Sequence, residues 1–469
     1  MTKVHVRPAF AAVALSGLLG LSGCTSLVPD STIAPAVSPV WHAPLPHQGA
    51  SGTLLRWWQQ QGDPVLVDLI ESAQAVSPTV AVALSRIEGA RASQASANSA
   101  LMPNISAQAG AARSVTQPNV PAATTVQGGL QASWEIDLVG ANRAVSNAAN
   151  AQVQGTQALW HDARVTVAAE VANLYYSLSS CRQQLGVAQR DAASRQETAR
   201  LTGISAQAGF VAPGVAALAR ASAADSQGRL TQQAAQCEAT IKGLVALTAV
   251  DEPQLRQKVA PALDKQAQAA PFSIVSVPAQ TITQRPDVFA AERDVVVAAA
   301  TVGSATAQRF PRLSLNGSIG ALRVSTAGTE QDVSTWSFGP LSLSLPIFDG
   351  GQRAAAVKSA QAAYQSAIVV YQGKVRQAVR EVEEALLNLH STGSREGDAL
   401  IAAKGYAESL AATQSRFDQG LASLVELEDA RRNALAADSA VLSLRLQRNL
   451  AWVSLYRAVG GGFEPNAPG

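Results

Sequence analysis

The sequence has 469 residues, which by length alone corresponds to about two to four domains. Its 36 lysines and arginines nearly balance its 34 aspartates and glutamates, so the formal net charge of +2 argues against nucleic acid or another polyanion as a partner. Charged residues make up only 15% of the chain, and its composition, rich in alanine, serine and glutamine, favours closely packed helices and argues against disorder.

The first 23 residues have the pattern of a signal peptide. Lys3 and Arg7 precede the stretch AFAAVALSGLLGL, which is too short to span a membrane as a helix. The small residues before Cys24 resemble the lipobox of bacterial lipoproteins, although a plain signal peptide with a chance cysteine is the alternative. The resemblance implies cleavage before Cys24, lipid such as palmitate on that residue, and, with Thr25 next, sorting to the outer membrane.

The mature chain repeats itself. EVANLYYSL at 170–178 matches EVEEALLNL at 381–389 at an offset of 211, and Gly209 matches Gly420 at the same offset. Each half is predicted to run in the order helix, strand, strand, long helix, turn, long helix.

The predicted strands alternate apolar and polar residues. In VQGGLQASWEIDL at 126–138 the apolar side chains occupy even positions, and LSLSLPI at 341–347 alternates in the same way. Trp336 and Phe338 precede this second stretch out of phase, which predicts a bulge at Gly339-Pro340. About ten alternating residues is the length of a tilted transmembrane strand, but a soluble antiparallel sheet with one buried face gives the same pattern.

The number of strands limits how they can be used. No later run of 18 apolar residues exists, so a membrane-spanning part would have to be a barrel. Four strands cannot close a barrel, because about eight is the smallest number that does so. The strands must therefore stay in water or be completed by other copies, and three copies would supply about twelve strands and leave a pore.

Two long segments have no proline, from Ala141 to about Ala208 and from Gln352 to about Phe417. Each could form a helix of roughly 65 residues, near 100 Å long, which requires a coiled-coil partner. Residues 214–250 and 421–458 supply these partners by folding back at glycine-containing turns.

Two cysteines test the first predicted hairpin. Cys181 and Cys237 each lie 28 residues from Gly209, so a hairpin turning at Gly209 brings them level with each other. In an oxidising compartment this predicts a disulfide between the helices, with free buried cysteines as the alternative.

TQRPDVFAAERD, at 283–294, has the features of a helix start in the second half. Pro286 suits the first helical turn, and Asp287 suits the positive end of the helix dipole. We interpret the Arg-Pro-Asp stretch as a structural boundary with no chemistry of its own.

Four stretches in order resemble the outer-membrane factor family of TolC-like trimeric exit ducts, in its lipoprotein, NodT- or OprM-like branch. They are WWQQQGDPVLVDLIESAQAVSPTVAVALSRIEGARA (57–92), RPDVFAAERD, RFPRLSLNGSIG and LPIFDGGQRAA. The resemblance covers essentially all of residues 24–460. Arg-Pro-Asp then begins the first helix of the second repeat.

The resemblance implies a mainly α fold with a β-barrel part, in which a trimer forms a 12-stranded outer-membrane β-barrel on a long periplasmic α-helical barrel. The expected segments are a signal peptide (1–23), an anchor and wrap segment (24–64), a first repeat (65–250, strands 101–114 and 126–138, hairpin 141–250), an equatorial linker (251–277), a second repeat (278–458, strands 311–323 and 334–347, hairpin 351–458) and a tail (459–469).

The resemblance also implies a periplasmic constriction. Val425 matches an apolar ring, and Glu426 with Asp429, three residues apart on one helix face, matches acidic rings; a merely solvated helix face is the alternative. Ala422 stands where some relatives have a basic gate residue, so that contact is absent. The hairpin tips expected to face an adaptor protein are Gly209, Phe210, Pro213, Gly420 and Leu421.

The expected function is passive conduction. The five histidines show no metal-ligand spacing, and no phosphate-binding loop or nucleophile motif is present, so we expect neither an enzyme nor a cofactor beyond the lipid on Cys24. The resemblance implies a homotrimer in the outer membrane of a Gram-negative bacterium, lipid-anchored and extending into the periplasm. It would expel drugs or other toxic small molecules with a periplasmic adaptor and a proton-driven inner-membrane pump. A protein-secretion duct and a lipid-anchored coiled-coil scaffold without a pore are the alternatives.

Overall fold

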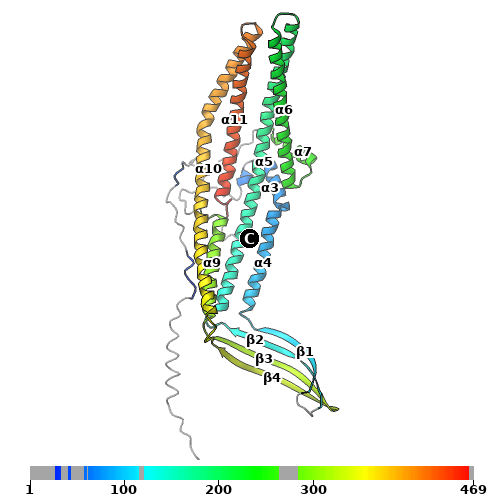
Figure 1. The fold of residues 1–469 in the computed structure, drawn as a ribbon, viewed down its shortest axis with the longest axis vertical. Coiled ribbons are helices and arrows are strands. Elements are labelled where there is room, and N and C mark those ends of the chain that lie inside the picture. The colour runs from blue at the N-terminus through cyan, green and yellow to red at the C-terminus, as the bar shows by residue number, and fades with distance from the viewer. Residues whose placement is uncertain are drawn as a thin grey trace, which may run out of the picture. The chain divides into compact units, whose positions relative to one another are not determined.

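The computed structural model of the chain describes residues 27–32, 41–43, 57–60, 62–115, 121–263, 282 and 284–463 (Figure 1). The predicted signal peptide, Cys24 and residues 464–469 lie outside these ranges. The chain divides into two compact units, each described by itself. The first contains Ile87–Thr156 and Ala291–Tyr371 with the residues up to Ala34, and the second contains Pro35–Arg86, Gln157–Ala290 and Gln372–Gly469.

The first unit holds one antiparallel sheet in the order β1-β2-β3-β4. Its strands are β1 (Asn104–Ser114), β2 (Ala123–Ile136), β3 (Arg312–Thr326) and β4 (Thr329–Ser344). β3 ends three residues later than predicted, and β4 begins five residues earlier than predicted, so both strands extend closer to the turn that joins them. The reason is a two-residue turn at Ala327 and Gly328, with φ of 53° and 86°, which continues the ladder up to the turn.

Away from the β3–β4 turn, the register gives the sheet one apolar and one polar face; near the turn the ion pair of Arg323 and Asp332 lies on the otherwise apolar side. Leu130 pairs with Ile319 and Ile319 with Trp336, whereas Gln131 pairs with Ser318 and Ser318 with Ser337. A bulge lets two residues of β4, Gly339 and Pro340, oppose Asn316 alone, as predicted. Because of this extra residue, β4 keeps its apolar side chains on one face: Trp336, Phe338, Leu341 and Leu343.

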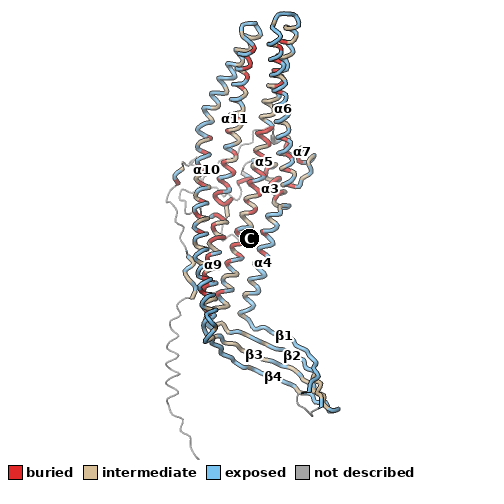
Figure 2. Tube along the Cα trace, viewed as in Figure 1, coloured by how far each residue is buried: buried red, intermediate tan, exposed pale blue. Residues whose placement is uncertain are grey.

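Neither face of this sheet is covered by the described part of the chain. No residue of the four strands is classed as buried (Figure 2). Side chains as large as Trp336, Phe338 and Leu343 are exposed. An uncovered apolar sheet face of this size marks a surface that needs a partner or an apolar surrounding.

Two helical hairpins dominate the chain. The first joins α5 (Ala141–Gln207) to α6 (Pro213–Thr248), and the second joins α10 (Gln352–Asp418) to α11 (Leu424–Ala458). The start and end of α10 follow those of α5 by 211 residues, and the bounds of α11 follow those of α6 by the same offset to within one residue. Gly209 and Gly420 occupy the turns with φ of 78° and 76°, a conformation that favours glycine.

Shorter helices flank the hairpins. They are α2 (Trp57–Gln60), α3 (Pro64–Val76), α4 (Pro78–Ser99), α7 (Glu252–Leu263) and α9 (Pro286–Ala307). Asp63 caps α3 by accepting from the amides of Val65 and Leu66, and it also accepts a 2.5 Å hydrogen bond from the Tyr175 hydroxyl. α7 lies in the expected linker, where Arg256 forms ion pairs with Glu238 of α6 and Glu252 of its own helix.

Among the described residues, no single helix is long and apolar enough to cross a membrane. Only the bent pair α3 and α4, at 53° to each other, passes a test of length and composition.

The largest fully buried side chains lie in the second unit, where the helices pack. They are Trp57, Tyr175, Leu66, Leu69, Leu178, Leu244, Leu255, Ile282, Leu386, Leu427, Leu455 and Val171. Many smaller core residues are alanine, which lets helix backbones approach closely. Burial of this apolar surface stabilises helices far longer than helix propensity alone could support.

Candidate functional site

The tip of the second hairpin is a capped helix start. Ser423 precedes α11, and its hydroxyl accepts a 3.2 Å hydrogen bond from the amide of Glu426. In return the Ser423 amide donates to the Glu426 carboxylate at 2.6 Å, which completes a capping box. These hydrogen bonds from the backbone and side chain of Ser423 hold the pKa of Glu426 below its ordinary value.

The predicted constriction residues all lie on exposed turns of α11. The Val425 side chain is 56% exposed, and Glu426 is exposed while serving in the cap. Asp429 is also exposed and forms a 2.7 Å ion pair with Arg432 one turn later. Asp429 is therefore partly neutralised by a cation of its own protomer, whereas Glu426 is held by the neutral groups of Ser423 and keeps its negative charge.

The tip of the first hairpin has no matching cap. Ala212 stands at the N-cap position of α6 without a side-chain hydrogen bond, and Pro213 follows at the first helical position. Phe210 is 84% exposed, and Leu421 on the second tip is exposed as well. The predicted adaptor-facing residues are thus apolar and accessible in the protomer.

A buried ionic network, which the sequence patterns did not predict, joins the hairpins near these tips. Arg195 of α5 pairs with Glu428 of α11, and the two side chains are only 8% and 10% exposed. Ser222 of α6 donates to the same carboxylate at 2.7 Å. Arg195 also contacts Asp191 at 2.9 Å, and Arg431 contacts Glu428 at 3.1 Å.

The network is balanced in charge. Its two buried arginines face two largely buried carboxylates, and Gln414 accepts from Arg431 at 2.8 Å. Burial, followed by the charge of Arg195, lowers the pKa of Arg431 from its ordinary value. Removing one partner of such a group leaves a buried charge without compensation, which typically costs about 3–5 kcal/mol. A groove of about 420 Å³ between α5, α10 and α11 borders the network.

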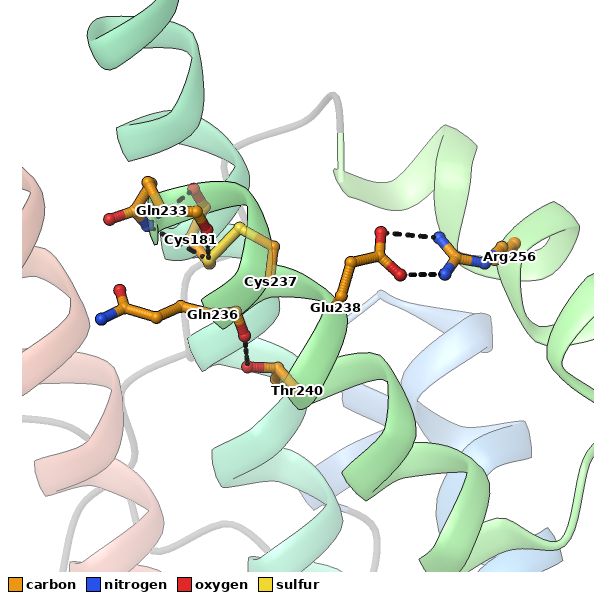
Figure 3. Close-up of a disulfide and its surroundings, with 7 residues drawn as sticks. All are labelled: Cys181, Gln233, Gln236, Cys237, Glu238, Thr240 and Arg256. Carbon is orange, nitrogen blue, oxygen red and sulfur yellow. Dashed lines mark hydrogen bonds and ion pairs between the residues drawn. A yellow bond between two sulfur atoms is a disulfide. The ribbon is translucent and has the colours of Figure 1, made fainter. Parts of the chain in front are cut away.

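Cys181 and Cys237 form a disulfide between α5 and α6 (Figure 3). Their Cα atoms are 5.6 Å apart, within the usual range for such a bond. Gln233, one turn before Cys237, donates to the carbonyl of Cys181 at 3.5 Å. The disulfide fixes the register of the two helices at this level.

Arg285 of the Arg-Pro-Asp stretch is a buried connector. Its guanidinium contacts Asp287 at 2.9 Å, Glu381 of α10 at 2.7 Å and the carbonyl of Ala458 at 2.9 Å. Burial acts to raise the pKa of Asp287, but the hydrogen bonds and charge of Arg285 outweigh it, so this pKa lies below its ordinary value. The stretch therefore joins the start of α9 to α10 and to the end of α11.

Within the described ranges, no group of three or more histidine, cysteine, aspartate or glutamate residues is arranged to hold a metal ion. The absence of a cofactor stays a prediction.

A duplicated pair of strands and a duplicated long hairpin define the class of outer-membrane exit channels. The chain belongs to the outer membrane efflux protein family, whose model matches residues 69–250 and 277–461. This confirms the predicted family and the predicted location in the outer membrane of a Gram-negative bacterium.

Individual relatives match over nearly their whole length. Outer membrane protein OprJ of Pseudomonas aeruginosa is 30% identical over 98% of this chain and 97% of its own. Nodulation protein T of Rhizobium leguminosarum bv. trifolii is 28% identical over 95% and 96%. The open state of the MtrE outer membrane channel of Neisseria gonorrhoeae superposes with a TM-score of 0.79 at 26% identity, over 94% of this chain and 99% of that one.

Proposed function

We propose that this chain is one protomer of a passive, trimeric exit duct that carries drugs or other toxic small molecules out of the cell. The observation that carries the proposal is the uncovered sheet with one apolar and one polar face. The apolar face suits lipid, and the polar face suits a water-filled lumen. Membership in an efflux family supports the same conclusion.

The proposal of a trimer follows from the edges of the sheet. β1 and β4 each have one side without a partner strand among the described residues. Open edges are not tolerated in lipid, because each unpaired backbone group costs several kcal/mol there. Three copies would pair each β4 with the next β1 and close a wall of about twelve strands.

The N-terminal residues support the proposed lipid on Cys24. Val28 packs against α9 at Gly303, where an added Cβ would lie 2.6 Å from the valine side chain. The carbonyl of Asp30 accepts a hydrogen bond from Tyr364 of α10. Val28 is four positions after Cys24 in the sequence, which allows a reach of at most about 14 Å. Because α9 leads directly into β3, this attachment would hold the lipid near the level where the strands begin.

The hairpin tips would supply the gate and the partner contacts. Val425, Glu426 and Asp429 of three copies would surround one axis, and the Arg195–Glu428 network would fix how α11 presents them. Exposed Phe210 and Leu421 would contact a periplasmic adaptor, and a proton-driven inner-membrane pump would supply the energy. A passive duct needs no catalytic group.

An export assay in cells tests this function. We expect a strain that lacks the chain to accumulate several-fold more ethidium than its parent, with an unchanged set of secreted proteins. Restoring the chain should reverse the accumulation. Unchanged dye accumulation with loss of secreted proteins would instead assign the duct to protein secretion, and no change in either would favour a scaffold.

A further inference from the structure

The charged side chains of the sheet are segregated by face and by end. The apolar face of the described strands carries them only near the strand turns, at Arg113, Arg323, Glu330 and Asp332. The polar face carries them only at the opposite end of the described strands, at Glu135 of β2 and Arg312 of β3. That end adjoins the helices, since α9 leads into β3 and β2 leads into α5.

Glu135 and Arg312 are diagonal neighbours on the polar face. Glu135 pairs with Ser314, which lies two residues from Arg312 on β3, so the Cβ atoms of Glu135 and Arg312 are about 7–8 Å apart. Both residues are exposed, and neither forms an ion pair with another described residue. By contrast, Asp137, two residues beyond Glu135, pairs with Arg143 at 3.4 Å. Glu135 and Arg312 therefore bring unmasked charge to this end of the polar face.

The rest of the polar face is a neutral wall. Over 123–133 of β2 it extends about 33 Å along the strand. Its side chains are amides, hydroxyls and aliphatic groups, and several of them bond to one another. Gln108 donates to Gln131, and the hydroxyl oxygens of Ser318 and Ser337 are 2.8 Å apart. Polar groups that satisfy one another leave few free donors or acceptors, so the wall binds a passing solute weakly.

We propose that Glu135 and Arg312, three of each in a trimer, form a charge-balanced ring at the inner mouth of the strand-walled lumen. A fixed charge acts over about 10 Å at 0.1 M salt, so the ring governs the charge preference at this mouth and the neutral wall beyond adds none. The balanced ring and the neutral wall together pass cations, anions and neutral molecules alike.

This assigns the duct small-molecule substrates of either charge sign. Any preference of the whole duct would then be set at the constriction, by Glu426 and Asp429. The inference rests on the proposed function, because the polar face must line the lumen.

Reversal potentials of the purified full-length protein in planar bilayers, under a gradient of potassium chloride, test the ring. The background is a Glu426→Gln, Asp429→Asn protein, in which the carboxylates of the constriction do not mask the effect. Relative to this background, Glu135→Gln should lower the ratio of potassium to chloride permeability about threefold, because it leaves Arg312 unbalanced. Arg312→Gln should raise the ratio by about the same factor. Ratios that stay at the background value in both variants would overturn the proposal.

Asp332→Asn is the matched control. It removes the same charge as Glu135→Gln, but from the opposite face and the opposite end of the strands. Its ion pair with Arg323 has side chains 69% and 57% exposed, so its loss should cost little stability. The permeability ratio should stay at the background value. A shift as large as that of Glu135→Gln would show that the face of the sheet does not matter, which contradicts the proposed ring.

Thiol labelling in lipid vesicles tests the neutral wall without altering the ring. Gln131→Cys should react with cationic and anionic methanethiosulfonates at equal rates, when each rate is divided by that of the same reagent with a free thiol. Ala132→Cys, on the opposite face, should be protected by lipid. A preference of Gln131→Cys for one charge, or equal labelling of the two cysteines, would overturn the proposal. A wild type that conducts nothing would refute the proposed duct instead, while the labelling rates would still decide whether the wall is neutral.

Discussion

Arg195 and Glu428, 233 positions apart in the chain, form an ion pair whose side chains are almost completely buried. The pair joins α5 of the first repeat to α11 of the second, a few turns from both tips. A movement of one hairpin tip relative to the other therefore either carries both side chains along or separates this buried ion pair.

Glu428→Gln should destabilise the helical hairpins markedly, by about 3–5 kcal/mol, because it leaves Arg195 and Arg431 buried with one carboxylate fewer. Thermal unfolding of the purified protein measures the effect. The matched control is Glu197→Gln, since Glu197 pairs with Arg200 on the surface with side chains 55% and 57% exposed. That substitution should change stability little. Similar losses for the two variants would contradict the assigned role of the buried pair.

Ser423→Ala should loosen the second tip by removing the cap of α11. We expect limited proteolysis between Arg416 and Ser423 to become about fivefold faster. Ala212→Ser tests the reverse change at the uncapped first tip and should slow cleavage there. No difference at either tip would mean that the caps do not control local opening.

The same cap should depend on pH. The pKa of Glu426 is lower in the folded chain than its ordinary value of 4.5. Its contribution to stability is therefore present above pH 4.5 and is lost as the pH falls through the lower, folded pKa. Proteolysis at the second tip should rise only in that acidic range in the wild type, and Glu426→Gln should remove this rise. A rise that persists in the variant would assign it to another group.

Charge placed on the two faces of the sheet should have opposite consequences. Ile319→Lys puts a cation on the apolar face and should cost about 2–4 kcal/mol if that face meets lipid. Ser318→Lys, one residue earlier, puts the same charge on the polar face and should be tolerated. The yield of folded protein in outer membranes measures both. Equal tolerance would contradict a lipid-facing surface.

Gly129 of β2 and Gly320 of β3 are paired on the polar face and permit close packing of the two strands. A Cβ at Gly129 would lie 2.6 Å from the carbonyl oxygen of Ile319, whereas a Cβ at Gly128 would meet nothing closer than 4.0 Å. Gly129→Ala should therefore reduce the yield of folded protein, and Gly128→Ala should leave it unchanged. Equal yields would show that the sheet relaxes around the added methyl group.

The regular parts of the fold followed from periodicity. Absence of proline over 141–207 and 352–417, with glycine at each reversal, was enough to predict hairpins whose observed bounds lie within one turn of those expected. The alternation of apolar and polar residues predicted the two faces of the sheet. The change in phase of this alternation after Phe338 predicted the bulge in β4. Helix and strand periodicity involve only residues that are close in the sequence, so these features can be predicted from it.

The buried ion pair and the position of α7 could not be predicted, because they depend on contacts between residues far apart in the sequence. Glu428 reads as one of several charges in VELEDARR, and nothing local indicates that Arg195 covers it. The segment 251–277 was expected to be a linker, yet its first part forms α7, which is held on α6 through Arg256. The β3–β4 turn was missed because Ala-Gly lacks the strong Asn-Gly signal.

Single-channel conductance in planar bilayers, on purified protein of known oligomeric mass, shows whether the chain forms a duct. We expect stepwise conductance from a trimer, which rises when Asp429→Ala or Glu426→Ala removes charge or capping at the constriction. Mutants that conduct like the wild type would remove the constriction assignment and leave the duct in place. A folded, lipidated trimer that conducts nothing would contradict the duct itself.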